Sequence, residues 1–371
     1  MPAELSDIIR SEIASCGPIP FRRYMEIALY HAEFGYYASG RACIGRRGDF
    51  FTNVSVGSLF GRLLARQIAE MWRVLGEPAI FTLIEQGVNA GDLAADVLGG
   101  LCGMFSECGE AVRYRIVEPF AKLEARQRER LTSFSGKVEW VRGLEELQVE
   151  AGVHFSNELP DAFPVHLVKW IGGEWCEQMV ADEGAGFVFA DGPLPTGGLR
   201  EACASIPGPL PEGYTTEVNL AASAWIREVA CVMQRGFVLA VDYGFPRGEY
   251  YAPFRTAGTL SAYANHRREP DPLARPGEID LTAHVEFDSL IEAAHAGGLR
   301  LEGFTDQHHF MVGLGAEHFA DGANAGDIRA FQTLMHPQFM GTAFKIAAFS
   351  KGIAPGDPLA GFGFARVPLV P

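Results

Sequence analysis

The segment from Phe81 to Leu98 constrains the fold of this chain more than any other part of its sequence. A β-forming run leads into a turn that contains Gly87 and Gly91, and the turn passes directly into a helical run. Glycine has no Cβ, so the backbone can turn sharply there and a ligand can lie close to it. The free N–H groups at the helix start point towards whatever occupies the turn. This pattern predicts a nucleotide-type cofactor site at the first strand of an open α/β sheet, with simple turn chemistry as the alternative.

A second strand supports this cofactor site. The run Tyr114-Arg-Ile-Val-Glu118 is mainly β-forming, ends in an acid and is followed by Pro119 at the start of a predicted helix. An acid at the end of the second strand is where the two hydroxyls of a ribose are held. A solvated glutamate before a helix is the alternative. Together, the turn and Glu118 predict a nucleoside cofactor.

Length and charge restrict the class of protein. The chain has 371 residues, of which 48% are apolar, and a formal net charge of -15 at pH 7. This length suits one large α/β domain with appendages or two smaller domains. The negative charge disfavours nucleic acid as the main partner and suits a basic protein substrate. No apolar run reaches membrane-spanning length and no signal or transit peptide is recognisable, so we expect a cytoplasmic protein.

The cysteines and histidines form no metal-binding pattern. Seven cysteines without a CxxC pair favour reduced, mostly buried thiols over a disulfide scaffold or a zinc site. The neighbouring His308 and His309 would diverge in any regular element. We therefore expect no metal site.

Strands alternate with helices along the middle of the chain, which favours a parallel sheet with right-handed crossovers. The predicted strands are 80–85, 114–117, 138–141, 153–156 and 237–242, with helices that begin near 92, 119 and 217. Upstream, we expect helices over 3–15 and from Ser58 to Gly76, with apolar spacing resumed over 21–29. Downstream, a helix near 285–297 and late strands near 299–304 and 343–350 complete the sheet.

Two segments interrupt this alternation. An insertion at about 165–215 contains short β-like runs, which suggest a small antiparallel lobe or lid. A loop at about 246–280, rich in proline, glycine and arginine, is too long to lack structure in a compact domain unless it is functional.

Motifs that run nearly from end to end identify the family. In chain order they are Gly35-Tyr-Tyr37, Gly48-Asp-Phe-Phe-Thr52, Phe60-Gly61, Glu85-x-Gly87-x-x-x-Gly91-x-Leu93, Val117-Glu118-Pro119, Ser156-Asn-Glu158-Leu-Pro-Asp161, Glu217, Asp242-Tyr-Gly244, Pro276-Gly-Glu-Ile-Asp280 and Met340-Gly-x-x-Phe-Lys345. In these motifs the chain resembles the MidA-like family of S-adenosylmethionine-dependent methyltransferases, which includes the mitochondrial protein arginine methyltransferase that acts as a complex I assembly factor.

The resemblance implies a Rossmann-like methyltransferase core, a mostly parallel sheet flanked by helices, with an N-terminal helical extension and an inserted lobe. On this basis 1–77 forms the extension and a cofactor-covering loop, and 78–371 forms the methyltransferase domain. The implied cofactor is S-adenosyl-L-methionine. The mitochondrial relative implies a protein arginine as the acceptor, with a respiratory-complex subunit as one kind of partner. The oligomeric state stays open, and a dimer is one alternative.

The motifs also imply which residues bind the cofactor. These are Gly48, Asp49, Thr52, Gly87, Asn89, Gly91, Glu118 and Asn157.

Three departures from the family pattern put cofactor binding in question. Asn89 replaces the middle glycine of the turn, Asp92 replaces a usually neutral residue, and Asn53-Val54-Ser55 replaces Ser-Pro-Glu. Asn tolerates positive φ better than other non-glycine residues, although it adds bulk. Asp92 facing the cofactor's carboxylate at about 5–6 Å would weaken binding roughly a hundredfold. Asp92 therefore points outward, meets the cofactor's ammonium, or marks weak or lost activity.

Four residues are candidates for the acceptor side of the site. Methyl transfer needs the nucleophile in line with the methyl group, and a guanidinium also needs carboxylates that orient it. Glu158 and Asp161, beyond the fourth strand, supply two; the alternative is that Asn157 and Glu158 cap a helix and Asp161 is solvated. Tyr243 could wall the pocket or belong to the core. His266 could be a base, a positioning group or an exposed loop residue.

Two other functions are alternatives to catalysis. The altered turn would suit a methyltransferase-like protein that assembles or binds a partner, whereas the retained Glu118 and the 157–161 segment argue against it. An NAD(P)-dependent oxidoreductase is disfavoured because the turn lacks GxGxxG spacing.

Overall fold

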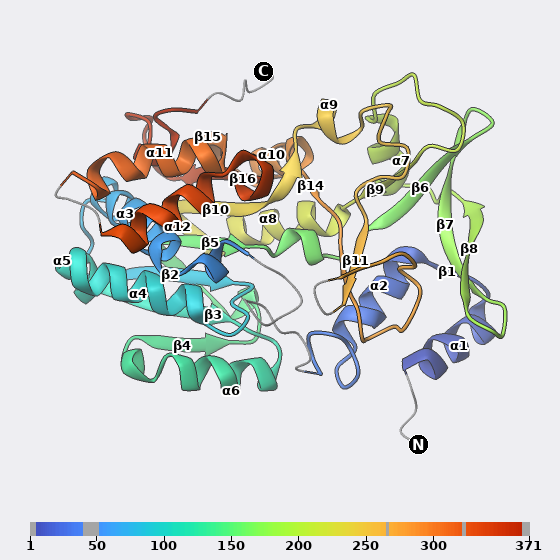
Figure 1. Cartoon of the computed structure of the whole chain (residues 1–371), viewed down its shortest axis with the longest axis horizontal. Coiled ribbons are helices and arrows are strands. Elements are labelled where there is room, and N and C mark those ends of the chain that lie inside the picture. The colour runs from blue at the N-terminus through green and yellow to red at the C-terminus, as the bar shows by residue number, and fades with distance from the viewer. Residues whose placement is uncertain (1–4, 40–51, 265–266, 321–323, 366–371) are drawn as a thin grey trace.

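The computed structural model describes residues 5–39, 52–264, 267–320 and 324–365 (Figure 1). Its centre is an eight-stranded sheet in the order β15-β16-β10-β5-β2-β3-β4, with β14 paired to β10. The strands are β2 (Phe81–Gln86), β3 (Val112–Val117), β4 (Val138–Val141), β5 (Val149–Asn157), β10 (Met233–Phe245), β14 (Val285–Glu286), β15 (Arg300–Asp306) and β16 (Phe344–Lys351). The run from β10 to β4 is parallel, whereas β16 is antiparallel to both of its neighbours. All seven predicted strands are confirmed.

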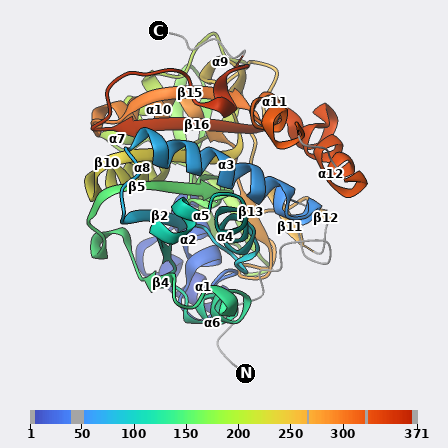
Figure 2. The ribbon, with the colours of Figure 1, turned by 90° about the vertical axis from the view of Figure 1, so that its left-hand side faces the viewer.

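Helices cover both faces of this sheet (Figure 2). They are α3 (Leu59–Val74), α4 (Asp92–Met104), α5 (Ser106–Ala111), α6 (Ala121–Arg130), α8 (Leu220–Val232), α10 (Phe287–Ala296), α11 (Gln307–His318) and α12 (Ala325–Met335). Successive strand residues point to opposite faces. Leu83 therefore belongs to the core under α3 and α4, and Ile84 to the core under α8 and α10. The sequence did not predict α11 and α12.

A second, antiparallel sheet forms the lobe predicted from the insertion. Its strands are β1 (Ile19–Pro20), β6 (His166–Ile171), β7 (Glu174–Asp182), β8 (Phe187–Pro193) and β9 (Thr215–Val218), with α7 (Gly198–Ala204) beside them. The N-terminal helices α1 (Leu5–Cys16) and α2 (Phe21–Tyr30) share a core with this sheet, since Phe21 and Tyr24 pack with Val180 and Phe187. The first 77 residues are thus divided between two parts of the fold: α1 and α2 pack on the antiparallel sheet, whereas α3 packs on the central sheet.

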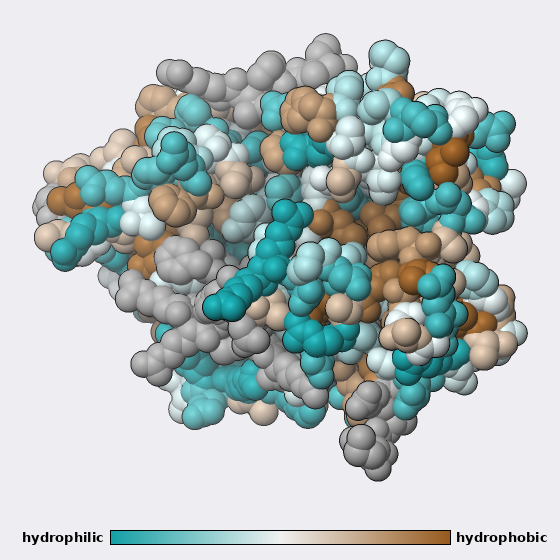
Figure 3. Space-filling model, turned by 45° about the vertical axis from the view of Figure 1, so that its right-hand side comes forward, coloured by the Kyte–Doolittle hydropathy of each residue, from teal (hydrophilic) through white to brown (hydrophobic). Residues whose placement is uncertain are grey.

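With the lobe in front, brown apolar residues gather in one hollow of a largely polar surface (Figure 3).

The long segment after β10 is more structured than the sequence suggests. It contains α9 (Arg247–Tyr250), β11 (Ser261–Ala264) and β12 (Arg267–Glu269) and leads into β13 (Asp280–Thr282), and β11 pairs antiparallel with both of the other strands. The sequence predicted a long functional loop over about 246–280; part of this segment forms short regular elements, because tertiary contacts order it, and its function stays a prediction.

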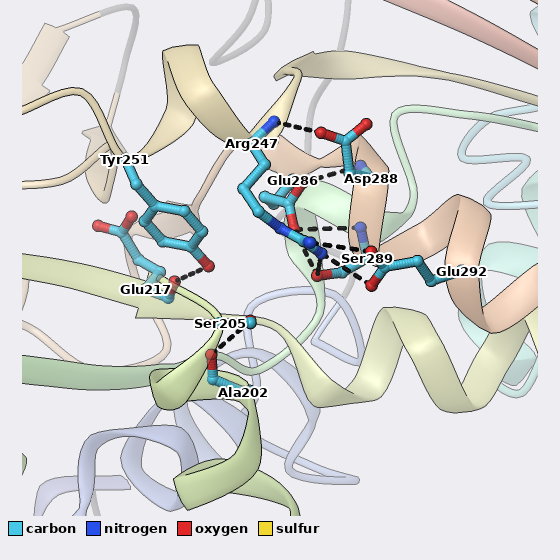
Figure 4. Close-up of polar contacts among 9 residues, drawn as sticks. All are labelled: Ala202, Ser205, Glu217, Arg247, Tyr251, Glu286, Asp288, Ser289 and Glu292. Atoms are coloured by element: carbon cyan, nitrogen blue, oxygen red, sulfur yellow. Dashed lines mark hydrogen bonds and ion pairs between the residues drawn. The ribbon is translucent and has the colours of Figure 1, made fainter. Parts of the chain in front are cut away.

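Two side chains anchor that segment. The buried carboxylate of Glu217 accepts hydrogen bonds from the backbone N–H groups of Thr259 and Leu260 and from the hydroxyl of Tyr250. Figure 4 shows the second anchor, Arg247, whose guanidinium contacts Glu292 at 2.8 Å while its backbone N–H donates to Asp288 at 2.8 Å. The buried bonds of Glu217 replace the water contacts that a free loop would make, and the contacts of Arg247 hold the segment at the surface.

The thiols are only partly as predicted. Among the six cysteines in the described residues, all are free; Cys108 and Cys203 are buried, but Cys16, Cys102 and Cys231 are exposed. The expectation of mostly buried thiols is wrong, because these three lie on the solvent sides of their helices. Within the described residues, no helix is long and apolar enough to cross a membrane.

Candidate cofactor and acceptor site

A cavity of about 680 Å³ lies at the carboxyl ends of β2, β3 and β5. This volume is within the usual range of small-molecule and cofactor sites. The wall is built from the turn after β2, the end of β3, the segment after β5 and several residues between Tyr30 and Ser55. The lining residues include Tyr30, Tyr37, Thr52, Glu85, Gly87, Asn89, Asp92, Glu118, Phe120, Asn157, Glu158 and Phe163.

The turn after β2 has the left-handed backbone that its glycines predicted. Its φ angles are 83° at Gly87, 50° at Asn89 and 92° at Gly91. A Cβ on Gly87 would lie 3.0 Å from the Cβ of Leu159, a tight contact that adds to the preference for glycine set by the positive φ. Asn89 adopts the positive φ that asparagine tolerates, and its substitution for glycine leaves the turn intact.

Glu118 lies where the sequence predicted the ribose-binding acid. It is buried at the end of β3, where Oε1 accepts the N–H of Phe120 at 2.8 Å and Oε2 accepts Nε2 of Gln127 at 2.7 Å. Burial raises the pKa of this carboxyl group, and the two hydrogen bonds oppose the rise. Each oxygen keeps acceptor capacity for a further donor. The carboxylate can therefore accept hydroxyl groups from a ligand in the cavity.

Asp92 is paired at the edge of the cavity. Its Oδ1 lies 2.6 Å from Nε of Arg130 on α6, and both side chains are about half exposed, at 53% and 47%. A guanidinium at this distance offsets the negative charge that would otherwise face a cofactor carboxylate. The repulsion expected for an unpaired Asp92 is reduced accordingly.

Glu85 is a cavity residue to which the sequence analysis gave no role. It precedes Gly87 on β2, is 2% exposed and accepts a hydrogen bond from the hydroxyl of Tyr114 on β3. Burial raises its pKa to about 8. The sequence did hold a signal for this residue, because an acid inside an apolar strand, just before a glycine turn, needs a hydrogen-bonding or charged partner.

Glu158 reaches the cavity, and Asp161 lies behind it. Nδ2 of Asn157 donates to Oε1 of Glu158 at 3.0 Å, and the backbone N–H of Asp161 donates to Oδ2 of Asp242 at 3.1 Å. Asp161 is 6% exposed and does not line the cavity. The alternative of a capped helix and a solvated Asp161 is therefore wrong.

Buried carboxylates from three segments gather behind Glu158. Burial and the neighbouring Asp161 raise the pKa of Glu158 and of Asp242, and burial with Asp280 raises that of Asp161 to about 7. Asp280, brought in by β13, accepts a hydrogen bond from the hydroxyl of Tyr37 at 2.9 Å. A bound cation would favour the ionised forms of these carboxyl groups, because it offsets the cost of burying their negative charge.

Amide side chains hold Asn157 in place. Nδ2 of Asn53 donates to Oδ1 of Asn157 at 2.7 Å and lies 3.4 Å from Oε1 of Gln307 on α11. This network turns the N–H groups of Asn157 towards Glu158. Asn53 belongs to a segment that departs from the family pattern, and Thr52 beside it lines the cavity.

The remaining predicted residues lie elsewhere. Tyr243 does not line the cavity; its ring packs on Phe344, with centroids 4.0 Å apart, and on His284. Gly48, Asp49 and His266 lie outside the described residues. The sequence analysis assigned no role to the aromatic wall formed by Tyr30, Tyr37, Phe120 and Phe163, where the Tyr30 and Phe120 rings stack at 6.3 Å.

Comparisons with known proteins agree with this architecture. Residues 63–305 match the family model described as "Putative S-adenosyl-L-methionine-dependent methyltransferase". The mitochondrial protein arginine methyltransferase NDUFAF7 homolog of Drosophila melanogaster is 29% identical, over 96% of this chain and 88% of its own. The human protein arginine methyltransferase NDUFAF7 is 26% identical, over 91% of this chain and 81% of its own.

Solved structures extend the comparison. A candidate methyl transfer enzyme from Burkholderia thailandensis, crystallised with S-adenosyl-homocysteine, has a TM-score of 0.88 and is 36% identical, covering 97% of this chain and 95% of that one. A second crystal structure from Burkholderia thailandensis has a TM-score of 0.84 with the same identity, covering 97% of this chain and 94% of that one.

Proposed function

We infer the reaction from one premise: the chain belongs to the S-adenosyl-L-methionine-dependent methyltransferases. We propose that it transfers a methyl group to an arginine of a protein. One observation supports arginine as the acceptor. Glu158 lies in the cavity wall, and the buried carboxyl groups of Asp161, Asp242 and Asp280 lie behind it. The relatives named as protein arginine methyltransferases support the same acceptor.

The residues of the cavity fit the cofactor. S-adenosyl-L-methionine, when bound, supplies an electrophilic methyl group. Glu118 would accept hydrogen bonds from the ribose hydroxyls, because both of its oxygens keep acceptor capacity in a cavity of about 680 Å³. Gly87 and Asn89 would allow the backbone of the turn to lie close to the ligand, and Glu85 would face its charged end.

On the acceptor side, Glu158 would accept N–H bonds from the guanidinium and fix its plane relative to the methyl group. The carboxylates behind it would stabilise the positive charge, and the aromatic rings of Tyr30, Tyr37 and Phe163 would exclude water. A cation beside Glu158 also lowers the pKa of that carboxyl group, so binding of the acceptor itself favours the ionised form.

The first prediction concerns Glu158→Gln. The variant keeps the shape of the side chain but loses its charge, and we expect methyl transfer to slow by about a hundredfold while cofactor affinity changes little. The measurement is transfer from labelled cofactor to proteins of a cell extract, with the label located by mass spectrometry. Glu129→Gln, on the exposed side of α6, is the matched control. Label confined to lysine, a small molecule or RNA would reject arginine, and full activity of Glu158→Gln would reject the role of that residue.

The second function considered, an assembly or binding protein without turnover, rested on the departures in the turn. Asn89 keeps the left-handed backbone and Asp92 is paired with Arg130, so neither departure argues against cofactor binding. We therefore favour catalysis.

From the family resemblance we propose a respiratory-complex subunit as a protein partner, to be checked by affinity capture. From the sequence we propose a cytoplasmic location, to be checked by cell fractionation.

A further inference from the structure

Gln127 connects the two parts of the cofactor site. It lies on α6, is fully buried and does not itself line the cavity. Its Nε2 donates to Oε2 of Glu118 at 2.7 Å and to the backbone oxygen of Asn89 at 2.9 Å. The first bond ends on the acid at the end of β3, and the second ends on the turn after β2.

The orientation of this amide is fixed by a third bond. Nε1 of Trp140, on β4, donates to Oε1 of Gln127 at 2.9 Å. A flipped amide would place its oxygen against the carboxylate of Glu118 and the carbonyl of Asn89, and its N–H groups against the indole N–H. Every contact would then be repulsive. The indole of Trp140 therefore determines that both N–H groups of Gln127 face the site.

We propose that Gln127 is a positioning residue that sets the separation between the ribose-binding carboxylate of Glu118 and the backbone of the cofactor turn at Asn89. This inference rests on the proposed function, because it takes Glu118 to bind the ribose. Gln127 acts through these two residues and does not touch the ligand.

Few side chains can replace Gln127 in this position. A carboxylate at 127 would face that of Glu118, and an apolar side chain would leave the indole N–H of Trp140 without its acceptor. Asparagine is shorter by one methylene and cannot reach both acceptors. The carboxylate of Glu118 would then lose the N–H of Gln127 and keep that of Phe120, and the turn at Asn89 would lose its hydrogen bond to Gln127 of α6.

The test uses calorimetric titration of the full chain with S-adenosyl-homocysteine and with its 2′-deoxy analogue. The variants are Gln127→Met, Gln127→Asn and Trp140→Phe, and Glu129→Ala on the exposed side of α6 is the matched control. We expect Gln127→Met and Gln127→Asn to bind S-adenosyl-homocysteine at least tenfold more weakly than the wild type. We expect Trp140→Phe to lose about threefold and Glu129→Ala to be unchanged.

The ratio of the two dissociation constants separates positioning from general destabilisation. The wild type should prefer the ligand with the 2′-hydroxyl, and the Gln127 variants should lose most of this preference. An equal loss for both ligands, or wild-type affinity in Gln127→Met, would overturn the proposal. If Gln127→Met does not fold, Trp140→Phe gives the same comparison. A wild-type chain that binds neither ligand would instead refute the proposed function.

Discussion

At the scale of single residues, the two unusual side chains of the cofactor turn are each supported by α6. Asn89 keeps its positive φ while its carbonyl accepts a bond from Gln127, and Asp92 is paired with Arg130. A left-handed conformation costs a non-glycine residue of order 1 kcal/mol, so it persists where neighbours determine it. Helix α6 thus supports both of the departures that lie in or next to the turn, Asn89 and Asp92.

The second prediction tests the pairing of Asp92. In Arg130→Ala the carboxylate faces the cavity without its partner, and we expect affinity for S-adenosyl-homocysteine to fall about twofold to fivefold, since exposed pairs contribute at most about 1 kcal/mol. The loss should shrink at high salt, which screens the charge. Calorimetry at two ionic strengths measures it.

The double variant Asp92→Thr with Arg130→Ala is the control for that pairing, because it removes both charges and should bind like the wild type. Unchanged affinity in Arg130→Ala alone would mean that the charge of Asp92 does not act on the ligand.

At the scale of elements, the contact between α3 and α4 places the cofactor turn, because α4 begins directly after Gly91. A Cβ at Gly61 of α3 would lie 2.4 Å from the Cβ of Asp96 on α4. The helices can approach this closely only with glycine at that position. The motif Phe60-Gly61 therefore has a packing role in the site.

The third prediction is that Gly61→Ala forces the two helices apart. Overpacking of this kind costs about 1–3 kcal/mol, and the shifted α4 should also weaken cofactor binding. Thermal unfolding and calorimetry measure both effects. Gly99→Ala is the matched control: a Cβ there has open space, and alanine is the better helix former. Equal unfolding temperatures for the two variants would contradict the claim that α3 and α4 need glycine at position 61 to pack this closely.

The longer strands of the central sheet and most of its helices were predictable because each has a local signal, either alternation with helices or a continuous apolar stripe. Helix α11 was missed because it carries two glycines and two leading histidines and has no clear apolar face in sequence. The short strands β11 and β12 were missed because their order depends on Glu217, which lies some forty residues earlier in the chain.

At the scale of the whole molecule, the backbone of the cofactor turn and the position of Glu118 were predictable, and the cluster of carboxyl groups behind Glu158 only in part. The turn and Glu118 lie within one stretch of sequence, where local chemistry predicts their positions; their roles as cofactor ligands stay predictions. Asp280 meets the carboxylates after β5 only through the fold, and Gln127 meets Asn89 only when α6 packs beside the turn. Such juxtapositions have no local signal, so the sequence could not reveal them.

Carboxyl groups that are fully or partly buried make the fold sensitive to pH, which is the fourth prediction. Burial raises the pKa of Asp96 to about 6, of Asp161 to about 7 and of Glu85 to about 8. In the unfolded chain these groups lose their protons near pH 4. Between about pH 4 and pH 8 the folded chain therefore binds more protons than the unfolded chain, and its stability falls as pH rises, by up to about 1.4 kcal/mol per pH unit for each group.

Burial lowers the pKa of His154 to about 3, whereas the pKa of a histidine in the unfolded chain is near 6.5. This group therefore makes stability rise with pH, but only below about pH 6.5. Above that pH the carboxylates dominate, so we expect the unfolding temperature of the ligand-free chain to fall between pH 6.5 and pH 8.5. Glu85→Gln removes a carboxyl group whose pKa lies at about 8 and should flatten the upper part of this fall. The exposed Glu129→Gln should leave the fall unchanged. An unfolding temperature that rises over this interval would show that these carboxyl groups are ionised in the folded chain at neutral pH.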